Sequence, residues 1–384
     1  MATSNRMELP VIAGEARKKG VQLVGSGDCL HPAWRSELKQ LDREGDPLVL
    51  DDTYFIPTVE VEDLNRVHHL ILVPSLSKAD ELYERFEAYS PNINDDGRPS
   101  VNLTGEEIAE IAQDSESLIG PAHAFTPWTA MYAYHNSISE CYGDLTDHIS
   151  FVELGLSADT AYADRISELH RLTFLTNSDA HSPWPNKLAR EFTRFEVKSI
   201  SFDELKKAIL REDERCPTMN IGFFPQEGKY NESACIRCFR HYTLREAVGM
   251  NWKCGCGGRI KKGVRDRVEE LADTTAHPAH RPPYLHIFPL SEIITMAIGH
   301  SSPDTKTVQT AWNKLIEAFG SEVEVLVDAK IESIDFVDER IVEAIKAFRE
   351  NRVILHPGGG GNYGQIELPT TTEKSIGQAS LSDF

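Results

Sequence analysis

Six polar side chains that can bind metal ions stand at or near the ends of apolar runs. Asp179 and His181 follow the run 172–175 in the stretch TNSDAHSPWP. On an extended backbone, residues two apart point to the same face. Comparable places in earlier runs hold Asp28, Glu60, His69 and His123, with Glu62 and His68 as neighbouring alternatives. Imidazoles combined with carboxylates suit zinc, manganese or iron, and two such metals can activate water for phosphoester cleavage.

The elements that would position these side chains alternate between residues 7 and about 215. Strand candidates are residues 20–27, 54–62, 66–74, 117–125, 149–156 and 172–179, and helical patterns occupy 77–89, 104–114 and 201–213. Thr104 is a suitable N-cap for the second helix, whose first turn is acidic. The alternation predicts βα units in a parallel sheet or barrel. Because barrel strands converge on one mouth at their carboxyl ends, the polar side chains should gather there.

Four of the seven cysteines form a second constellation. They occur as Cys235-x2-Cys238 and Cys254-x-Cys256, which matches a structural tetrahedral zinc held by two tight turns, although the second pair has only Gly255 between its cysteines. The other three, Cys29, Cys141 and Cys216, are scattered and are expected to be small buried residues. The odd number and the lack of a secretory signal argue against a disulfide framework.

The composition is that of a globular protein with two or three domains. The 384 residues are 40% hydrophobic and 26% charged, without an apolar stretch of membrane-spanning length, so a cytoplasmic location is expected. The formal net charge of −20 argues, as a sum, against nucleic-acid binding. Local patches count for more than this sum.

Two local features could bind phosphate groups. The stretch GRIKKGVRDR forms a basic stripe of Arg259, Lys261, Lys262, Arg265 and Arg267. It suits phosphate contacts, and an ordinary solvated face is the alternative. The run HPGGGGNYG would let backbone amides approach a phosphate, or would serve as a flexible turn.

Changes in composition divide the chain. Residues 219–263 are Cys-rich and loop-like, and helical patterns return at 290–299, 307–320 and 338–350. We therefore expect a metal-hydrolase domain at 1–218, a four-cysteine zinc-binding module at 219–263, a mainly helical domain at 264–368 and a disordered tail at 369–384. No internal repeat is visible.

Several motifs resemble the archaeal endonuclease Q family over about residues 7–367. They are GVQLVGSGDCLHPAW, VNLTGEEIAEIA, LIGPAHAFTPWT, ELGLSAD, NSDAHSP and GRIKKGVRDR. That family belongs to the polymerase-and-histidinol-phosphatase (PHP) superfamily. The resemblance implies an α/β fold, namely a distorted (βα)7 barrel with a small zinc-binding insert and a C-terminal helical region. It also implies incision of DNA 5′ of uracil, hypoxanthine, xanthine and abasic sites.

The resemblance also implies a ligand set. Asp28 matches the second motif, Glu60 and His69 the third, and His123 the histidine after the next strand, with His68 left open as the alternative to His69. Asp179 and His181 match the terminal Asp-x-His pair, and Asp179 is the first choice as the essential catalytic residue. The implied cofactors are divalent metals in the barrel (Zn, Mn or Mg) and one structural Zn.

One motif of the superfamily is missing. A His-x-His pair should lie on a first strand upstream of Met1, and no other His-x-His occurs in the sequence. Either the start codon has been placed too far downstream, or the product lacks two ligands and is impaired. We expect the former, because every later element is present.

The leading expectation is a metal-dependent DNA repair endonuclease. Phe125 and Trp128 are candidates for a base pocket, and Arg190 and Arg194 for phosphate contacts. A small-molecule phosphoesterase and a catalytically impaired lesion-binding protein are the alternatives. The expected partner is damaged DNA and not a membrane. No residue pattern identifies a replication or repair clamp as a partner, and the oligomeric state, the metals and the lesion preference stay open.

Overall fold

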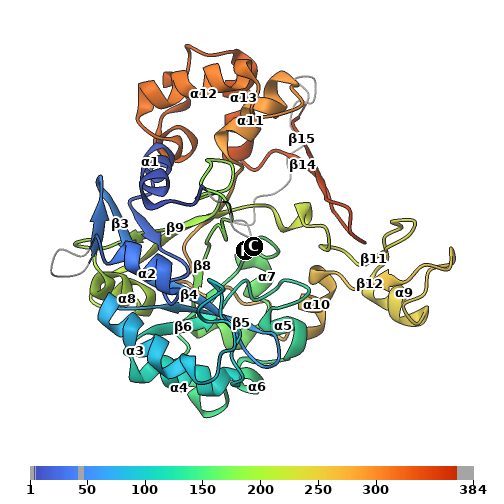
Figure 1. Cartoon of the computed structure of the whole chain (residues 1–384). Coiled ribbons are helices and arrows are strands. Elements are labelled where there is room, and N and C mark those ends of the chain that lie inside the picture. The colour runs from blue at the N-terminus through green and yellow to red at the C-terminus, as the bar shows by residue number, and fades with distance from the viewer. Residues whose placement is uncertain (1–3, 5, 42–46, 370–384) are drawn as a thin grey trace.

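Short apolar runs of the N-terminal half form most of the strands of the fold (Figure 1). The computed structural model describes residues 4, 6–41 and 47–369. The strands of this half are β1 (Leu23–Gly25), β2 (Leu48–Leu50), β3 (Thr53–Ile56), β4 (Thr58–Glu62), β5 (His68–Leu72), β6 (Leu118–Pro121), β7 (Phe151–Glu153), β8 (Thr173–Leu175), β9 (Phe192–Glu196) and β10 (Cys216–Gly222). Its helices are α1 (Leu9–Lys19), α2 (Pro32–Leu38), α3 (Leu76–Glu87), α4 (Gly105–Asp114), α5 (Met131–Tyr134), α6 (Ile138–Tyr142), α7 (Thr160–Ala163) and α8 (Phe202–Leu210).

The described strands pair in several small sheets. Four of them have the orders β1-β3-β2, β4-β5-β6, β7-β8 and β13-β10-β9, where β13 is Tyr284–His286. Parallel pairing joins β1 to β3, β7 to β8 and β10 to β13, whereas β4, β5 and β6 pair in antiparallel fashion. The fold is therefore mixed α/β. Among the described strands, the hydrogen bonds do not close into one ring.

Helix α4 begins where the sequence predicts. Thr104 accepts a hydrogen bond from the Glu107 amide at 3.2 Å, and the Glu107 carboxylate accepts one from the Thr104 amide at 2.8 Å. This capping box satisfies two amides that a helix start leaves unpaired. The prediction of Thr104 as the N-cap is confirmed.

The apolar residues form two large cores. The first runs from Leu9 to Ala189 and also takes in Val264 and Val268 of α10 (Val264–Leu271). The second joins the end of β10 to β13 (Tyr284–His286), α11 (Leu290–Ile298), α12 (Lys306–Phe319) and α13 (Glu339–Arg349). In Figure 1 these last three helices stand together above the strands. The first core thus draws on chain from both sides of the four-cysteine module.

The four-cysteine module projects to one side of the molecule (Figure 1). It contains β11 (Ala234–Cys235), α9 (Leu244–Gly249) and β12 (Ile260–Lys261), with β11 and β12 paired in antiparallel fashion. Its own small core consists of Cys235, Tyr242, Ala247, Cys254 and Ile260. So small a core requires a further source of stability, such as a bound metal.

The glycine run packs against the base of this module. It lies between β14 (Ile354–His356) and β15 (Gln365–Glu367). The amides of Gly358, Gly359, Gly361 and Gly364 donate to the backbone carbonyls of Gln226, Asn362, Lys229 and Glu227 at 2.8–3.0 Å. A β-carbon on Gly360, whose φ is +64°, would lie 2.6 Å from the Cys235 carbonyl oxygen. The glycines therefore allow close packing, and these four amides are not free to bind a phosphate.

None of the helices in the described part of the chain has the length and apolarity that crossing a membrane requires. The tail predicted to be disordered lies, apart from Pro369, outside the described residues.

A buried ion pair ties the two large cores together. Lys19, at the end of α1, places its ammonium 2.6 Å from Glu322 Oε1, and both side chains are almost fully buried. Glu322 also accepts from the Leu290 amide at 2.8 Å and from Trp312 Nε1 at 3.0 Å. The same ammonium donates to the Pro185 carbonyl at 2.9 Å. One lysine thus connects α1, the C-terminal helices and the loop after β8.

Replacing Lys19 by Met should therefore lower the free energy of unfolding by about 3 kcal/mol or more, because it leaves a buried carboxylate without its cation. Urea denaturation measures the change. Lys18→Met is the matched control, since Lys18 forms a half-exposed pair with Glu15 and should cost less than about 1 kcal/mol. Equal effects of the two substitutions would contradict this account of Lys19.

Candidate metal centre

The β4–β5 hairpin presents its polar side chains on one face. Glu62 stands opposite His68 in the register, and Val61 stands opposite His69. Because side chains alternate along a strand, Glu60, Glu62 and His68 share one face, and His69 lies on the other.

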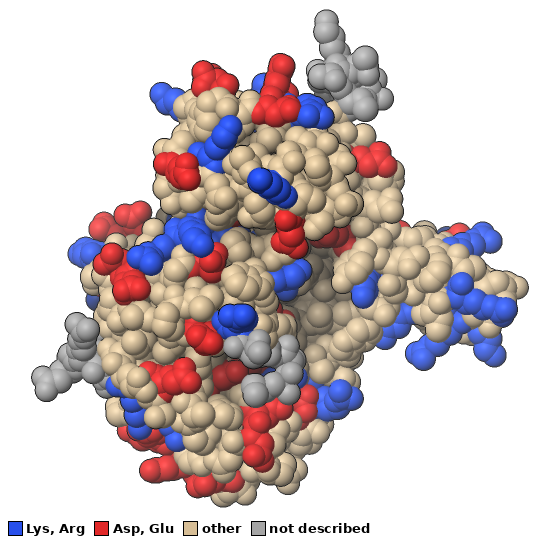
Figure 2. Space-filling view, turned by 45° about the horizontal axis from the view of Figure 1, so that its top comes forward, with Lys and Arg blue, Asp and Glu red and all other residues tan. Residues whose placement is uncertain are grey.

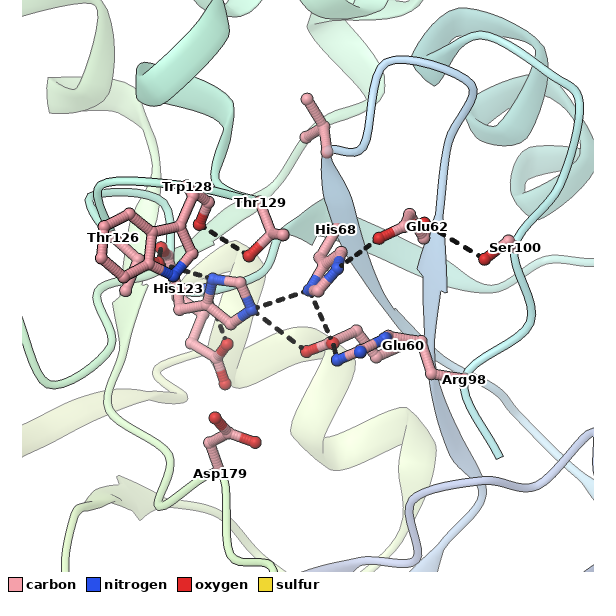
Figure 3. A network of polar contacts seen from close by, with 12 residues as sticks. Glu60, Glu62, His68, Arg98, Ser100, His123, Thr126, Trp128, Thr129 and Asp179 are labelled. Carbon is pink, nitrogen blue, oxygen red and sulfur yellow. Dashed lines mark hydrogen bonds and ion pairs between the residues drawn. The ribbon is translucent and has the colours of Figure 1, made fainter. Parts of the chain in front are cut away.

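Glu60, His68 and His123, here called the Glu60 cluster, come together at the centre of Figure 3. Glu60 Oε1 lies 2.9 Å from His68 Nδ1, and Glu60 Oε2 lies 3.4 Å from His123 Nε2. The two imidazole nitrogens are 3.1 Å apart. Nitrogen and oxygen ligands of a tetrahedral zinc ion lie about 3.3–3.5 Å from one another, so this donor set fits a divalent metal.

The outer nitrogen of each histidine ring is held by an oxygen. His68 Nε2 lies 3.1 Å from Glu62 Oε2, and Ser100 donates to the other oxygen of Glu62 at 3.1 Å. His123 Nδ1 lies 2.8 Å from Thr126 Oγ1 (Figure 3). Metal-binding histidines show this pattern, because an oxygen partner fixes the ring and leaves the inner nitrogen for the metal.

Electrostatics keep Glu60 ionised. Burial opposes its ionisation, but hydrogen bonds from His123 and His68 outweigh burial and hold the pKa of this carboxyl well below its ordinary value. Arg98 adds an ion pair to Glu60 Oε1 at 2.9 Å. For His123, burial favours the neutral ring, but Glu60 raises the pKa to about 9. The pocket therefore favours positive charge next to Glu60.

Glu153, at the end of β7, supports His123 from behind. It accepts a hydrogen bond from the His123 amide at 2.8 Å and one from the Asn177 side chain at 2.8 Å. Burial raises the pKa of its carboxyl to about 7. Glu153 is a functional candidate absent from the sequence prediction, although a carboxylate within the apolar predicted strand 149–156 could have indicated it.

Three candidate ligands share an unusual backbone conformation, with a positive φ angle. Asp28, His123 and Asp179 follow β1, β6 and β8, and their φ angles are +47°, +30° and +41°. Residues other than glycine rarely adopt positive φ, and such strained positions gather at functional sites. Asp28 also has Gly97 packed against its carboxylate, so closely that a β-carbon there would clash. Burial, followed by repulsion from Asp96, raises the pKa of Asp28.

Asp179 lies near the Glu60 cluster but outside its hydrogen bonds (Figure 3), and His181 stands two residues further along the chain. His181 Nε2 is 3.5 Å from Asp179 Oδ1, and each side chain is about half exposed (51% and 49%). A cavity of about 860 Å³ brings this pair together with Asp28, Glu60, Glu153 and Arg98. Its inner wall is apolar and includes Leu23, Phe55, Leu70 and Leu175.

His69 belongs to another group. It is fully buried, with Nδ1 at 2.8 Å from the Tyr142 hydroxyl and Nε2 at 3.4 Å from Asp63 Oδ2, and Cys141 lies beside them. The structure thus separates the neighbouring histidines. His68, the alternative left open by the sequence, stands in the Glu60 cluster, and His69 packs into the core.

The two aromatic candidates also differ. Phe125 is 4% exposed and packs on Tyr132, with ring centroids 5.1 Å apart, so it is a core residue and not part of an open base pocket. Trp128 is 45% exposed, and its backbone carbonyl accepts a hydrogen bond from the Thr129 hydroxyl (Figure 3). Lys261 places its ammonium 4.9 Å from the Trp128 ring centroid, which joins the site to the four-cysteine module.

Most of the predicted phosphate-binding cations are engaged within the chain. Arg194 forms two hydrogen bonds with Asp328 at 2.9 and 2.7 Å, and Arg190 donates to the Ser178 carbonyl at 3.0 Å. In the basic stripe, Lys262 pairs with Glu270, Arg265 with Glu232 and Asp266, and Arg267 with Glu270 and the carbonyls of Tyr132 and His135. Only Lys261 and Arg259 of the stripe lack a carboxylate partner among the described residues.

The four cysteines of the module converge as predicted. Their sulfur atoms lie within 4.8 Å of one another, with Cys235 and Cys256 at 3.5 Å and Cys238 and Cys254 at 3.5 Å. Thiolates around a tetrahedral zinc are about 3.8 Å apart, so the group fits one zinc ion. The Tyr242 hydroxyl donates to Cys254 Sγ at 3.0 Å and lowers the pKa of that thiol to about 6.

Known proteins resemble this chain in sequence. Residues 289–352 match the family model of the MJ0043 C-terminal domain. The uncharacterised protein MJ0043 of Methanocaldococcus jannaschii is 45% identical over 269 residues, which are 67% of this chain and 33% of that protein. The chain thus spans a third of the length of MJ0043. The uncharacterised protein YqxK of Bacillus subtilis is 32% identical over 373 residues, which are 93% of this chain and 91% of YqxK.

Two solved structures resemble this chain over all or nearly all of its length. The lesion-specific endonuclease Q of Pyrococcus furiosus is 48% identical, with a TM-score of 0.93 over 100% of this chain and 94% of that chain. An endonuclease Q bound to a 27-mer duplex with an abasic lesion at its active site is 49% identical, with a TM-score of 0.90 over 96% of this chain and 93% of that chain. With these likenesses in both sequence and structure, the chain belongs to the endonuclease Q family.

Proposed function

We propose that this protein is a metal-dependent DNA repair endonuclease. It would cut the phosphodiester 5′ of deaminated bases (uracil, hypoxanthine and xanthine) and of abasic sites. The observation that carries the proposal is the Glu60 cluster, in which two imidazole nitrogens and a carboxylate face one another while oxygen partners hold the outer ring nitrogens. Likeness to an endonuclease Q with an abasic duplex at its active site supports DNA as the substrate. We also propose that the separate sheets correspond to a distorted PHP-type barrel.

Each residue of the site then has a role. Glu60, His68 and His123 would hold one divalent metal (Zn, Mn or Mg), and Asp28, Asp179 and His181, which line the same cavity as Glu60, would supply further ligands. A bound metal supplies the Lewis acid for phosphodiester hydrolysis. Glu62 and Thr126 orient the two rings, and Glu153 holds the His123 backbone. Arg98 lines the same cavity and would donate hydrogen bonds to a phosphate oxygen.

Trp128 would stack on the lesion nucleotide. Its ring is half exposed, five residues after His123 in the chain, and Lys261 and Tyr230 contact it from the module side. Stacking on an aromatic face stabilises a base that has left the duplex, and a damaged or mispaired base leaves more readily. The four-cysteine module would bind one structural zinc and thereby fix Lys261.

A lesion-binding protein with impaired cleavage is a second candidate. The observation in its favour is that Asp179 and His181 lie outside the group of donors that can share one ion. Binding of damaged duplex without incision under Zn, Mn and Mg would support it. Hydrolysis of small phosphate esters alone would favour a phosphoesterase.

The neighbouring histidines offer a matched test of the metal site. His68→Ala should reduce the bound metal, measured by mass spectrometry, and lower incision at least about tenfold, because a ligand is lost. His69→Ala should lower the unfolding free energy by about 3 kcal/mol while the folded protein keeps its metal, because this ring packs in the core. The reverse pattern would contradict the assignment.

Asp179→Asn should lower incision of an abasic duplex at least about 100-fold with little change in DNA affinity, because Asn keeps the shape but loses the charge that attracts a cation. Nicking and fluorescence anisotropy measure the two quantities. Asp80→Asn is the control, since it removes a surface carboxylate that pairs with Lys39. Near-normal cleavage by the Asp179 variant would rule out its role.

Replacing Cys235 and Cys238 by Ser should release one zinc ion and loosen residues 222–263, because bound zinc commonly supplies the folding energy of so small a module. The rest of the chain should stay folded on its own cores. Hydrogen exchange and metal analysis test this, with Cys216→Ser as the control. A chain that shows no zinc dependent on these cysteines would disprove the assignment.

A further inference from the structure

The cavity at the candidate metal centre is lined by an ion pair between two distant parts of the chain. Arg194 of β9 donates to both carboxylate oxygens of Asp328, at 2.9 and 2.7 Å. Both residues line the cavity of about 860 Å³ that also holds Asp179, His181 and Glu60. Figure 2 shows Lys and Arg side chains next to Asp and Glu side chains around the hollow in this face of the molecule.

This ion pair is not needed to hold the two large cores together. Lys19 and Glu322 are 3% and 1% exposed, and they already form a buried ion pair between α1 and the C-terminal helices. Arg194 and Asp328 are 34% and 39% exposed. An exposed ion pair contributes little to stability, because water and salt compete for both partners. Another anion can therefore replace Asp328 on Arg194 without unfolding the chain.

Asp328 is presented by a helical turn that is fixed without its side chain. It is the last residue of η4 (Glu324–Asp328), a π-helical segment. Such segments are rare and are frequent at functional sites. Val325 is fully buried in the second core, and Arg349 of α13 donates to three backbone carbonyls of residues 325–329 at 2.5–2.9 Å. The Asp328 carboxylate is thus free to act on Arg194 alone.

The charges around the pair allow Arg194 to leave. Hydrogen bonds with Asp328 raise the pKa of Arg194 against the effect of burial, and the charge of Glu324 adds to the rise. Arg349 lies near the same two carboxylates, since burial lowers its pKa and Asp328 and Glu324 act in the opposite direction. Asp328 therefore keeps a cation nearby when Arg194 turns to another anion.

The geometry of the pair is the one by which arginine binds phosphate. Two N–H groups of a guanidinium donate side by side to two oxygens of a carboxylate or of a phosphate. Here Nη1 and Nη2 of Arg194 donate to Oδ1 and Oδ2 of Asp328. The carboxylate thus takes up the two donors that a phosphodiester in the cavity would use.

We propose that Asp328 occupies the place of a DNA phosphate on Arg194 in the free protein, and that a backbone phosphate of the duplex replaces it on binding. This inference rests on the proposed function, which supplies DNA as the ligand. Asp328 competes with DNA for Arg194 and thereby weakens binding. Glu324 adds repulsion to a phosphate that approaches before the exchange.

Single substitutions test the exchange with a 27-mer abasic duplex. Asp328→Asn should raise the affinity about two- to fivefold, which is the strength of an exposed ion pair. Arg194→Gln should lower the affinity, and the slope of log K against log salt should fall in magnitude by about 0.9, or one phosphate contact. Fluorescence anisotropy measures both quantities. The matched control is Glu350→Gln, which removes a carboxylate of similar exposure from its pair with Arg352 and should leave the affinity nearly unchanged.

The double variant separates the exchange from a general effect of charge. With Arg194→Gln in place, Asp328→Asn should not raise the affinity further, because the group for which Asp328 competes is gone. Equal gains with and without Arg194, or a gain no larger than that of Glu350→Gln, overturn the proposal. So does an Asp328→Asn chain that loses stability in urea without binding DNA more tightly, since that is the result of a purely structural pair.

Failure of the proposed function gives a different result. In that case the unaltered chain neither binds nor incises the duplex. A chain that binds and incises the abasic duplex, but whose affinity shows no coupling between Arg194 and Asp328, contradicts the exchange alone.

Discussion

The structure around Glu60, His68 and His123 depends on positive charge being present between these three side chains. An ionised carboxylate and two ring nitrogens within 3.4 Å of one another, in a largely buried position, need a cation or shared protons to be stable. The surrounding residues hold the two rings in the orientation that a cation between them requires. Glu62 and Thr126 fix the outer ring nitrogens, so that the inner nitrogens face a common point.

The remaining elements hold the loops that carry this site. The turns after β1, β6 and β8 contain residues with strained backbone, and distant parts of the chain help to hold them, since the Cys29 amide donates to the Thr58 carbonyl and the Ala124 amide to the Glu153 carbonyl. Lys19 and Glu322 fix the loop after β8 from the C-terminal helices, and Arg267 of α10 donates to the carbonyls of Tyr132 and His135, in and just after α5. The C-terminal helices and α10 are therefore part of the machinery that positions the site, although they contribute no ligand to the Glu60 cluster.

Charge is distributed unevenly over the molecule. Several of the cations that the sequence marks as phosphate contacts pair with carboxylates of the chain, namely Arg194 with Asp328, Lys262 with Glu270 and Arg265 with Glu232. Residues 236–259 of the four-cysteine module are the exception, with exposed cations and little acid.

The sequence by itself determined the features that rest on local chemistry. The Cys-x2-Cys and Cys-x-Cys spacing, the Thr104 capping box and the polar residues after apolar runs are all readable within a few residues. Only the tertiary structure decided which of two neighbours faces the site. His68 and His69 are adjacent in one strand and point to opposite faces, and Phe125 and Trp128 are three residues apart in one loop. Which side chain of each pair faces the site depends on what packs on either side of the strand or loop. The pairing of Arg194 with Asp328, 134 residues away, is likewise invisible to spacing, because the chain must fold before those two charges meet.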